Sequence, residues 1–449
     1  MPEIGPEHPT TFRHELVAPI FRKLRGRESC AVVGAASMGK SRLIHFVLRP
    51  DVQRHYLGEA YTQTLLACVD CNRLVSFTPW ALHELILTAL VEGCGEHPAL
   101  ADQRAQFNQL REQAIITRNE LLAQRHVELA LRMLCKEQSW QVGLLLDEFD
   151  AAYRTLPPQA LASLRALRDM NKYQLSFVLF LRDQPMHIRP PDEAEGFYEL
   201  VSRSVLGLQP YTEEDARRIA TQILARRSHE LPGVNQTVIP ELLHLSGGHP
   251  GLLVALIDAL VEDRPLGEPW PDWAARQPKI DEECRKLWEG LREEERQALY
   301  QVTHAMAPAQ GERDSLLLKG LLKPTEGETP ALFSPLFQRY AVARAPISAG
   351  GLHVDAASGM VWVNGQQTAD LTDKEFQLLA FLFAREGEIC TVEQLIEHLY
   401  PGQERFNVND SAIAQLVKRI RDKIEPGATQ YRHLLNVRGR GYRLVVDAP

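Results

Sequence analysis

The stretch CAVVGAASMGKSRLIHFVL, residues 30–48, decides the architecture of the first part of this 449-residue chain. It opens with four small or β-branched apolar residues, passes through a turn that holds Gly34 and Gly39, and closes in a run whose apolar residues recur at helical spacing. An unalternated apolar run directly before a glycine turn and a helix is typical of a strand that is buried on both faces. We therefore expect a parallel sheet whose first strand leads into a glycine-rich loop.

Further apolar runs follow this stretch as far as about Asp183: TLLACVD, VGLLLDEFD and LSFVLFLRD, with helical sequence between them. This alternation predicts an α/β domain, and the helix-forming sequence after it predicts a small helical lid. The Pro-rich break RPLGEPWPDW and the linker APISAGG separate the later parts. We predict a multidomain α/β and α+β protein with four parts: a parallel-sheet core at 1–206, a helical lid at 207–265, a first winged helix at 266–345 and a second winged helix at 346–449.

Composition limits the class of protein. With 45% hydrophobic and 24% charged residues, the chain can bury several cores. Its cysteines are scattered, and the close pair Cys68 and Cys71 has no second pair to complete a zinc site, so we interpret both as strand residues. No signal pattern or membrane-length apolar run is present, which favours a bacterial cytoplasmic protein with no membrane partner.

Charge is distributed unevenly along the chain. The net charge of −8 argues against a protein that coats DNA indiscriminately, because non-specific affinity comes from neutralising phosphates. Residues 416–443 nevertheless hold eight Lys or Arg against two acids, whereas residues 346–415 hold three against ten. The sequence thus predicts a basic patch near the C-terminus.

The segment GAASMGKS, residues 34–41, has the spacing of a phosphate-binding P-loop in the required context of strand and helix. Its glycines let backbone N–H groups wrap phosphates, Lys40 would reach the β and γ phosphates, and the Ser41 hydroxyl would bind Mg²⁺. The alternative is a glycine turn that binds nothing. We expect ATP or ADP with Mg²⁺ as the ligand, held by these residues of the loop: Gly34, Ala35, Ser37, Met38, Gly39, Lys40, Ser41 and Arg42.

The acids that end the run VGLLLDEFD supply the second half of such a site. We expect Asp147 to hold Mg²⁺ and Glu148 to polarise the attacking water, so that hydrolysis accompanies binding. The alternative is that both acids face solvent without a role.

The order of these motifs resembles the STAND class of signalling ATPases and their relatives among the origin-recognition and replication-initiator AAA+ proteins. It comprises the P-loop, DEFD, a strand ending in Arg182-Asp183, PYTEED and SGGHPGLL, and it covers residues 10–345. The resemblance implies that Arg182 senses the γ-phosphate and that the lid segment Gly248, His249 and Pro250 contacts the nucleotide. A surface charge and a helix-capping turn are the respective alternatives.

The stretch SRSVLGLQPYTEED resembles the segment of initiator ATPases in which an arginine finger precedes the lid. This implies that Arg203 completes the site of a neighbouring subunit, as in a homo-oligomer of the ATP state; an ordinary surface arginine is the alternative. The chain departs from typical STAND proteins because no repeat of 20 to 50 residues follows the ATPase.

Residues 350–446 resemble the OmpR/PhoB type of winged helix-turn-helix. GGLHVDAASGMVWVNGQQTADLT matches the leading small sheet, DKEFQLLAFLFAREGEIC and TVEQLIEHLY match two helices, VNDSAIAQLVKRIRDKI matches the recognition helix and LLNVRGRGYRLVV matches the wing. The resemblance implies double-stranded DNA as a partner. The alternative is a protein-interaction domain whose basic face is merely solvated.

Helical spacing on the recognition helix turns Ile413, Val417, Ile420 and Ile424 toward the core. The outward positions supply our candidates for DNA contacts: Gln415 and Lys418 for base edges, Arg419, Arg421 and Lys423 for phosphates, and Arg438 and Arg440 at the wing tip, with Arg440 entering a minor groove.

Two functions fit these features. The first is an ATP-dependent switch of the STAND kind that binds DNA and regulates transcription or another DNA-linked response. The second is an AAA+ ATPase that oligomerises on DNA and recruits a separate effector in mobile-element or antiphage biology. A P-loop kinase with an appended interaction domain is a third, which the absence of a recognisable acceptor pocket disfavours.

Overall fold

The structure is a computed structural model. It describes residues 8–227, 229, 236–263, 265, 267–303, 306–324, 330–344, 352–355, 360–363, 366–368, 371–400, 410–426, 428 and 431–446. The chain divides into two compact units, residues 1–343 and 344–449, and each is described by itself.

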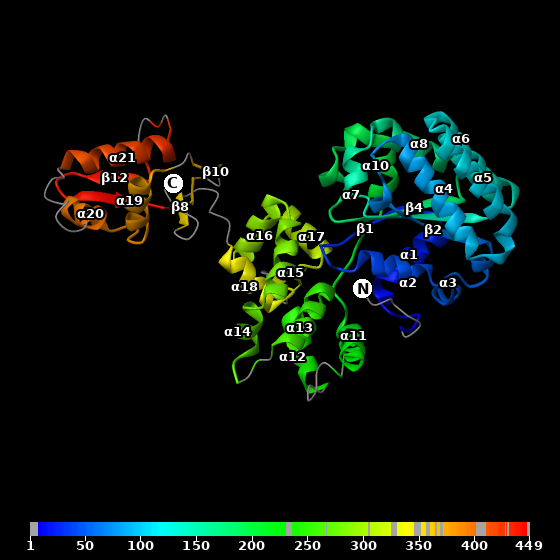
Figure 1. Ribbon diagram of the computed structural model, residues 1–449, viewed down its shortest axis with the longest axis horizontal. Coiled ribbons are helices and arrows are strands. Elements are labelled where there is room, and N and C mark those ends of the chain that lie inside the picture. Colours follow the sequence, from blue (N-terminus) through cyan, green and yellow to red (C-terminus); the bar gives the residue numbers. More distant parts are fainter. Residues whose placement is uncertain are drawn as a thin grey trace. The chain divides into compact units, whose positions relative to one another are not determined.

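A five-stranded parallel sheet forms the centre of the first unit (Figure 1). Its spatial order is β2-β3-β4-β1-β5, so β4 lies between the strand of the P-loop and the strand of the DEFD acids. Since the carboxyl ends of parallel strands share one edge, the residues that follow β1, β3 and β4 must meet there. The strands are β1 (Cys30–Val33), β2 (Thr64–Asp70), β3 (Gln141–Asp147), β4 (Leu175–Leu181) and β5 (Val205–Gly207).

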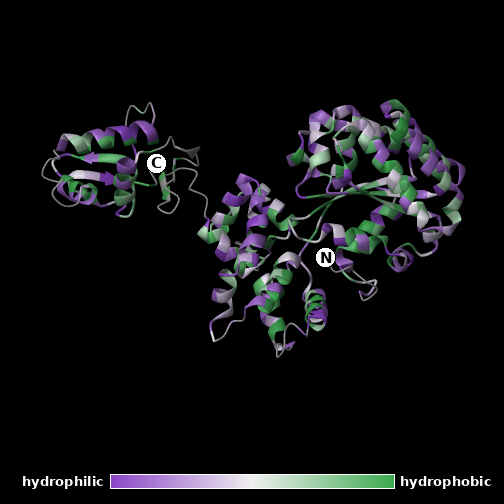
Figure 2. Ribbon diagram, viewed as in Figure 1, coloured by the Kyte–Doolittle hydropathy of each residue, from purple (hydrophilic) through white to green (hydrophobic). Residues whose placement is uncertain are grey.

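Helices cover both faces of this sheet, which is why its strands are apolar at consecutive positions (Figures 1 and 2). Val32 and Phe180 lie on one face of the sheet and pack against a first set of helices. Val33 and Leu146 lie on the other face and pack against a second set. The first set is α1 (His14–Arg25), α2 (Lys40–Leu48) and α3 (Pro50–Leu57); the second is α4 (Pro79–Gly95), α5 (Ala101–Thr117), α6 (Glu120–Arg132), α8 (Pro158–Met170) and α10 (Glu195–Ser202), with the short α7 (Asp150–Thr155) and α9 (Pro185–Ile188) after β3 and β4.

In the described residues of the rest of the first unit, the elements are helices apart from the short paired strands β6 and β7. The hydrophobic core of this part is continuous with one face of the sheet, because Leu208, Leu252, Trp273 and Phe337 belong to the same buried cluster as Val32. The elements are α11 (Glu213–Arg226), α12 (Ile239–Ser246), α13 (Pro250–Glu262), α14 (Trp270–Ala275), α15 (Pro278–Glu289), α16 (Glu293–Thr303), α17 (Gln310–Leu318), β6 (Leu322–Lys323), β7 (Ala331–Leu332) and α18 (Pro335–Ala343).

The end of α17 contacts the sheet through close backbone packing. A Cβ placed on Gly207 would lie 2.2 Å from the carbonyl oxygen of Leu318, so only glycine fits at the end of β5. The side chain of Gln209 donates to the carbonyls of Leu317 and Leu318, at 3.1 Å each. These contacts attach the helices after residue 266 to the edge strand of the sheet.

The second unit has the predicted winged-helix elements, with one correction. The first helix was predicted to continue to Cys390, but it ends at Phe383, because Gly387 has φ +77° and residues 389–390 pair with the wing instead. The elements are β8 (Leu352–Asp355), β9 (Met360–Val363), β10 (Gln366–Gln367), α19 (Asp373–Phe383), β11 (Ile389–Cys390), α20 (Val392–Leu399), α21 (Asp410–Ile424), β12 (Leu434–Val437) and β13 (Gly441–Leu444), in two three-stranded sheets of order β10-β9-β8 and β11-β13-β12.

Neither Cys68 nor Cys71 has a cluster of further ligands around it. Cys68 is half-buried on β2, but Cys71 is buried in the 3-10 turn after that strand, so only Cys68 is a strand residue; no group of three potential metal ligands occurs among the residues that the structure describes. In the same described part of the chain, no helix has both the length and the apolarity needed to span a bilayer.

Candidate nucleotide site and DNA-binding surface

The P-loop connects β1 to α2 and needs glycine at two points. Gly39 precedes α2 with φ +86°, and a Cβ on Gly34 would lie 2.8 Å from that of Leu208. Ser37 also has a positive φ, +53°, which is uncommon for a residue with a side chain. The loop therefore makes a tight turn directly before α2, the place at which the backbone of a P-loop holds phosphate.

Lys40 is almost completely buried beside this loop. Its Nζ donates to the carbonyls of Gly34 at 3.0 Å and Ala35 at 3.3 Å. Burial lowers its pKa, and the neighbouring carboxylates of Glu148, Asp150 and Asp147 oppose that change. The ammonium thus lies between the loop and the acids that follow β3, where it can neutralise a phosphate.

Asp147 ends β3 and is also buried. Burial raises its pKa, against the opposing effects of the Ser41 hydroxyl and the Glu148 N–H, which donates to its Oδ1 at 2.9 Å. A hydroxyl and a carboxylate together form an oxygen donor pair of the kind that Mg²⁺ prefers. These two residues therefore fit a magnesium ion that accompanies a phosphate.

Arg182 follows β4 and contacts the acid that follows β3. Its Nη2 lies 3.0 Å from Oε2 of Glu148, and its backbone N–H donates to Oδ1 of Asp150 at 2.8 Å. The strand order brings these residues together, because β4 is the immediate neighbour of both β1 and β3. Glu148 has φ +45°, an unusual conformation at the point where its carboxylate turns toward the site.

Asp150 is a site residue that the sequence reasoning missed. Burial raises its pKa, its Oδ1 holds the backbone of Arg182, and its charge acts on Lys40. Its position two residues after Glu148 in DEFD could have suggested a role in the site. Nothing else in the sequence distinguishes it from an acid on the surface.

His249 is completely buried at the start of α13. Its Nδ1 accepts from the N–H of Leu252 at 3.1 Å, so the proton is on Nε2, which donates to the carbonyl of Ala36 at 3.0 Å. Burial lowers its pKa to about 4, which keeps the ring neutral. His249 thus caps a lid helix and holds the P-loop backbone, and Pro250 after it lines the cavity described below.

Arg13 is a second residue that was not predicted. It is buried, its Nη2 donates to the carbonyl of Met38 at 3.2 Å, and its backbone N–H donates to Asp215 of α11 at 3.0 Å. Its guanidinium also lies 4.3 Å from the ring centre of Tyr211. It therefore connects the N-terminal segment to the P-loop and the lid.

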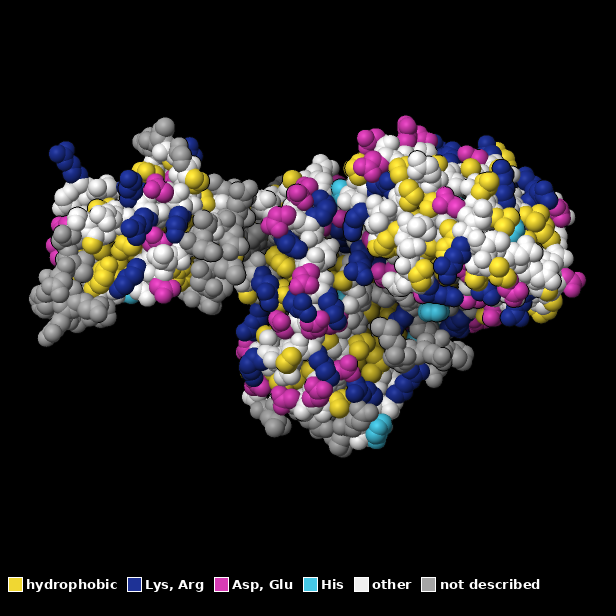
Figure 3. Space-filling view, turned by 45° about the horizontal axis from the view of Figure 1, so that its top comes forward, with side chains coloured by type: hydrophobic (Ala, Val, Ile, Leu, Met, Phe, Trp, Pro, Cys, Tyr) yellow, Lys and Arg dark blue, Asp and Glu magenta, His cyan; other side chains and the backbone are white. Residues whose placement is uncertain are grey.

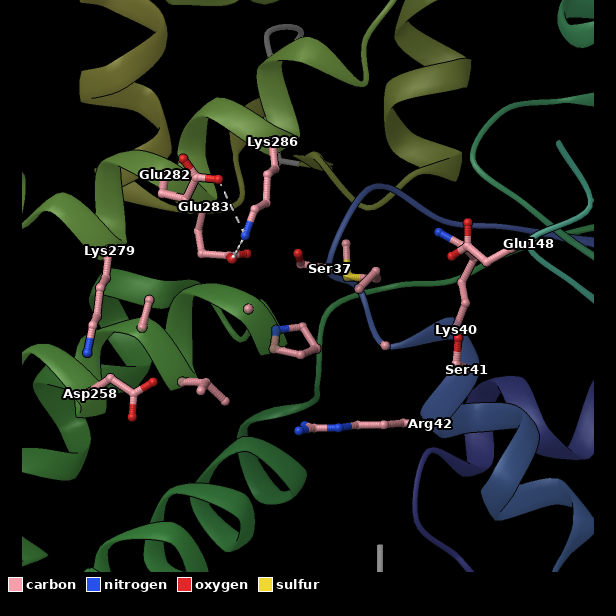
Figure 4. Close-up of a pocket in the computed structure, with 16 residues that line it drawn as sticks. Ser37, Lys40, Ser41, Arg42, Glu148, Asp258, Lys279, Glu282, Glu283 and Lys286 are labelled. Atoms are coloured by element: carbon pink, nitrogen blue, oxygen red, sulfur yellow. Dashed lines mark hydrogen bonds and ion pairs between the residues drawn. The ribbon is translucent and has the colours of Figure 1, made fainter. Parts of the chain in front are cut away.

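A cavity of about 440 Å³ opens beside the P-loop. Figure 4 shows the loop side chains on one side of it and those of α13 and α15 on the other. Helix α15, from the part predicted as the first winged helix, thus supplies one wall of this cavity. The lining residues are Ser37, Met38, Gly39, Lys40, Ser41, Arg42, Glu148, Pro250, Gly251, Val254, Ala255, Asp258, Lys279, Glu282, Glu283 and Lys286.

Arg203 lies away from this cavity. It is exposed directly before β5, at the amino-terminal edge of the sheet, whereas the P-loop follows the carboxyl end of β1. There it lines a second cavity of about 360 Å³ with Arg165, Arg168 and Lys172 of the α8 region. Arg203 cannot reach the nucleotide site of its own subunit.

In the second unit, α21 buries the apolar residues predicted to face the core: Ile413, Val417, Ile420 and Ile424. Gln415, Lys418 and Arg419 are exposed on its outer face. Figure 3 shows Lys and Arg side chains spread over the visible face of this unit.

Two of the predicted phosphate-binding residues make contacts within the unit. Arg421 donates from Nε to the carbonyl of Leu434 at 2.8 Å and lies over Tyr431. Lys423 contacts buried Glu375 at 2.8 Å. Burial would raise the pKa of Glu375, but Lys423 and the Thr372 N–H hold it below its ordinary value. Arg421 and Lys423 thus lie on the side of α21 that packs against the rest of the unit. Of the three residues predicted to bind phosphate, Arg419 is the exposed one.

The wing tip is shaped by two glycines. Gly439 has φ +71°, and a Cβ on Gly441 would lie 2.0 Å from the carbonyl oxygen of Cys390. Arg438 and Arg440 are exposed on this tip, and the Arg440 N–H closes the turn on Val437 at 2.9 Å. The hairpin therefore presents two cations on a constrained turn.

Comparison with known proteins identifies the second unit. The family model described as "Transcriptional regulatory protein, C terminal" matches residues 365–444. Sensory transduction protein RegX3 of Mycobacterium tuberculosis is 36% identical over 99 residues, which cover 22% of this chain and 42% of RegX3. This chain thus spans less than half of that relative's length.

Two solved structures complete the comparison. The DNA-binding domain of RstA from Klebsiella pneumoniae, in complex with the RstA box, is 25% identical, covering 21% of this chain and 92% of that one with a TM-score of 0.19. A Walker-type ATPase of Pyrococcus abyssi is 14% identical, covering 74% of this chain and 98% of that one with a TM-score of 0.45. The family match rests on the second unit, and residues 365–444 of this chain are a C-terminal domain of the transcriptional regulatory protein family, with the winged-helix fold.

Proposed function

We propose that this chain is an ATP-dependent switch of the STAND kind, which acts in the bacterial cytoplasm and binds double-stranded DNA through its second unit to regulate transcription or another DNA-linked response. The observation that carries the nucleotide half is the convergence of Lys40, Asp147, Glu148 and Arg182 at one sheet edge, beside the cavity of about 440 Å³. The family match of residues 365–444 supports the DNA half.

The cavity has the mixed lining that a nucleotide requires. The P-loop end offers backbone N–H groups and Lys40 to the phosphates. Pro250, Val254 and Ala255 offer an apolar surface farther along, which suits a base. Ser41 and Asp147 would hold Mg²⁺, which neutralises phosphate charge when bound.

Glu148 and Arg182 perform the hydrolytic step under this proposal. Their ion pair of 3.0 Å holds both side chains at the site. A γ-phosphate attracts the guanidinium, and this releases the Glu148 carboxylate to accept a proton from the attacking water. Arg182 would then stabilise the charge that develops on the transferring phosphoryl group.

The proposal is tested by ATP hydrolysis and nucleotide binding of the purified full chain, with and without double-stranded DNA, at two salt concentrations. Lys40→Ala should abolish binding, because it removes the cation from the loop, whereas Lys136→Ala, at an exposed position outside the cavity, should bind as the wild type does. Equal nucleotide binding by wild type and Lys40→Ala would refute the assignment of the site.

A second function is favoured by the position of Arg203. Its exposure beside Arg168 and Lys172, at the edge opposite the P-loop, suits a residue that completes the site of a neighbouring copy. The chain would then oligomerise on DNA in the ATP state and recruit a separate effector, as in mobile-element or antiphage systems. Particle growth with ATP and DNA that Arg203→Ala abolishes would support this function; particles of unchanged size would exclude it.

A further inference from the structure

Helix α15 contributes charged side chains to the nucleotide cavity, and the hydrolytic roles proposed above use none of them. Lys279, Glu282, Glu283 and Lys286 line the wall opposite the P-loop (Figure 4). The helix lies some 240 residues after the P-loop in the chain and belongs to the part predicted as the first winged helix. Its charges are therefore brought to the site by tertiary packing alone.

Glu283 is the α15 acid that packs most closely on the P-loop side. The position of a Cβ on Gly251 would be 2.5 Å from its Oε2 and 2.6 Å from Cβ of Ser37, so the carboxylate and the loop flank Gly251 together. Lys286 contacts the other oxygen, Oε1, at 2.7 Å. Oε2 is buried and has no hydrogen-bond partner among the described residues. The carboxylate is thus paired with Lys286 through one oxygen, while its other oxygen is a buried acceptor without a donor at the wall of the cavity.

The negative charge of Glu283 beside the P-loop repels the negative charges of a bound phosphate chain. The side chain of Glu283 is 15% exposed, so solvent screens its charge less than it would on an open surface. The loop at Ser37 is part of the phosphate cradle, and each additional phosphate brings further negative charge into the same space. Lys286 offsets part of this repulsion through one oxygen only.

We propose that Glu283 is a specificity-determining residue which disfavours a nucleoside triphosphate relative to a diphosphate while α15 is docked on the P-loop. This inference rests on the proposed nucleotide function. Because coupling between two equilibria is reciprocal, a bound triphosphate weakens the docking of α15, and a docked α15 weakens binding of the triphosphate. The docking of the helices that follow the lid thereby depends on whether a diphosphate or a triphosphate is bound.

Titration calorimetry of the full chain with ADP and with the slowly hydrolysed analogue ATPγS tests this inference. Glu283→Gln keeps the shape of the side chain and removes its charge. We expect the Kd for ATPγS to fall at least about fivefold more than the Kd for ADP. Glu289→Gln makes the same change on the exposed side of α15, outside the cavity, and should leave both affinities unchanged.

Glu283→Gln could change nucleotide affinity in two ways: by removing the repulsion between Glu283 and the phosphates, or by freeing Lys286 to bind them. A double variant distinguishes these two effects. Glu283→Gln should still favour ATPγS in a Lys286→Met background; a gain that disappears there, or equal gains for ADP and ATPγS, would overturn the inference. Binding of both nucleotides by the wild type, with no change in Glu283→Gln, refutes the inference alone. A wild type that binds neither nucleotide refutes the proposed function as well.

Discussion

Arg182 and Asp183 are adjacent in the sequence, but their side chains bind opposite parts of the first unit. Arg182 pairs with Glu148 beside the P-loop cavity at 3.0 Å, whereas Asp183 contacts both Lys319 and Arg292 at 3.1 Å. A single turn after β4 therefore connects the candidate γ-phosphate sensor to the helices beyond the lid.

The first prediction concerns hydrolysis. Glu148→Gln should retain ATP binding, because the amide leaves the P-loop intact, and should reduce turnover by at least about a hundredfold, because an amide cannot act as the general base. Binding and steady-state hydrolysis measured on one preparation check this. Turnover at the wild-type rate would remove Glu148 from its proposed role.

The second prediction concerns the buried cluster around Lys319, which is 1% exposed and contacts Glu295, itself fully buried, at 2.7 Å. Lys319→Met should destabilise the first unit by about 3 kcal/mol, because it removes the buried ammonium and leaves Arg292 as the remaining cationic partner of Glu295 and Asp183. Denaturant unfolding measures the change. Lys323→Met, also near the hairpin but without a carboxylate partner in the described ion pairs, should cost less.

A third prediction follows from the pKa of His249, which burial lowers from 6.5 to about 4. In the unfolded chain this histidine is protonated below about pH 6.5, whereas in the folded chain it is protonated only below about pH 4. The free energy of unfolding therefore decreases as the pH falls from 6.5 to about 4. The loss amounts to about 3 kcal/mol at its lower end.

His249→Asn tests this pH dependence, since asparagine can cap α13 but does not titrate. We expect thermal unfolding between pH 7 and pH 5 to depend less on pH in this variant. His83, whose pKa burial also lowers to about 4, gives the reference variant His83→Asn. His83→Asn should reduce the pH slope in the same way, and an unchanged slope in His249→Asn would show that His249 does not contribute to it.

The fourth prediction concerns DNA. Arg440→Ala should weaken double-stranded DNA binding, because it removes the cation that we expect in a minor groove, and should reduce the slope of log affinity against log salt by about one, as expected when one cation fewer displaces counterions. Arg385→Ala removes another exposed arginine of the same unit, outside α21 and the wing, and serves as the control. Equal effects of both substitutions would contradict a specific role for the wing.

The prediction of the parallel sheet and of the second winged helix is confirmed by the structure, because both rest on local patterns. Consecutive apolar residues report burial on both faces of a strand, and a helix such as α21 shows its buried side through the spacing of Ile413, Val417 and Ile420. The end of α19 was wrong, since pairing of residues 389–390 with β13 is a long-range contact that no local window contains.

Site residues, too, were predictable from the sequence only where they lie in a local motif. The P-loop, Asp147 and Glu148 are local motifs, and the structure brings them together with Arg182; their roles in nucleotide binding stay predictions. His249 was predicted to contact nucleotide, and the structure shows it capping α13 and binding the carbonyl of Ala36. Arg13 and Glu283 lie in no motif, and Asp150, although it ends DEFD, was given no role from the sequence.

The sequence alone determined which segments form strands and helices, where phosphate-binding and acidic residues follow strands, and which domain ends the chain, because each depends on residues within one element. Only the tertiary structure decided that β4 lies between β1 and β3, which places Arg182 against Glu148. It alone also brought Glu283 to the P-loop across some 240 residues of chain. The physical reason is that strand order and helix docking depend on burial of whole faces, which local spacing does not encode.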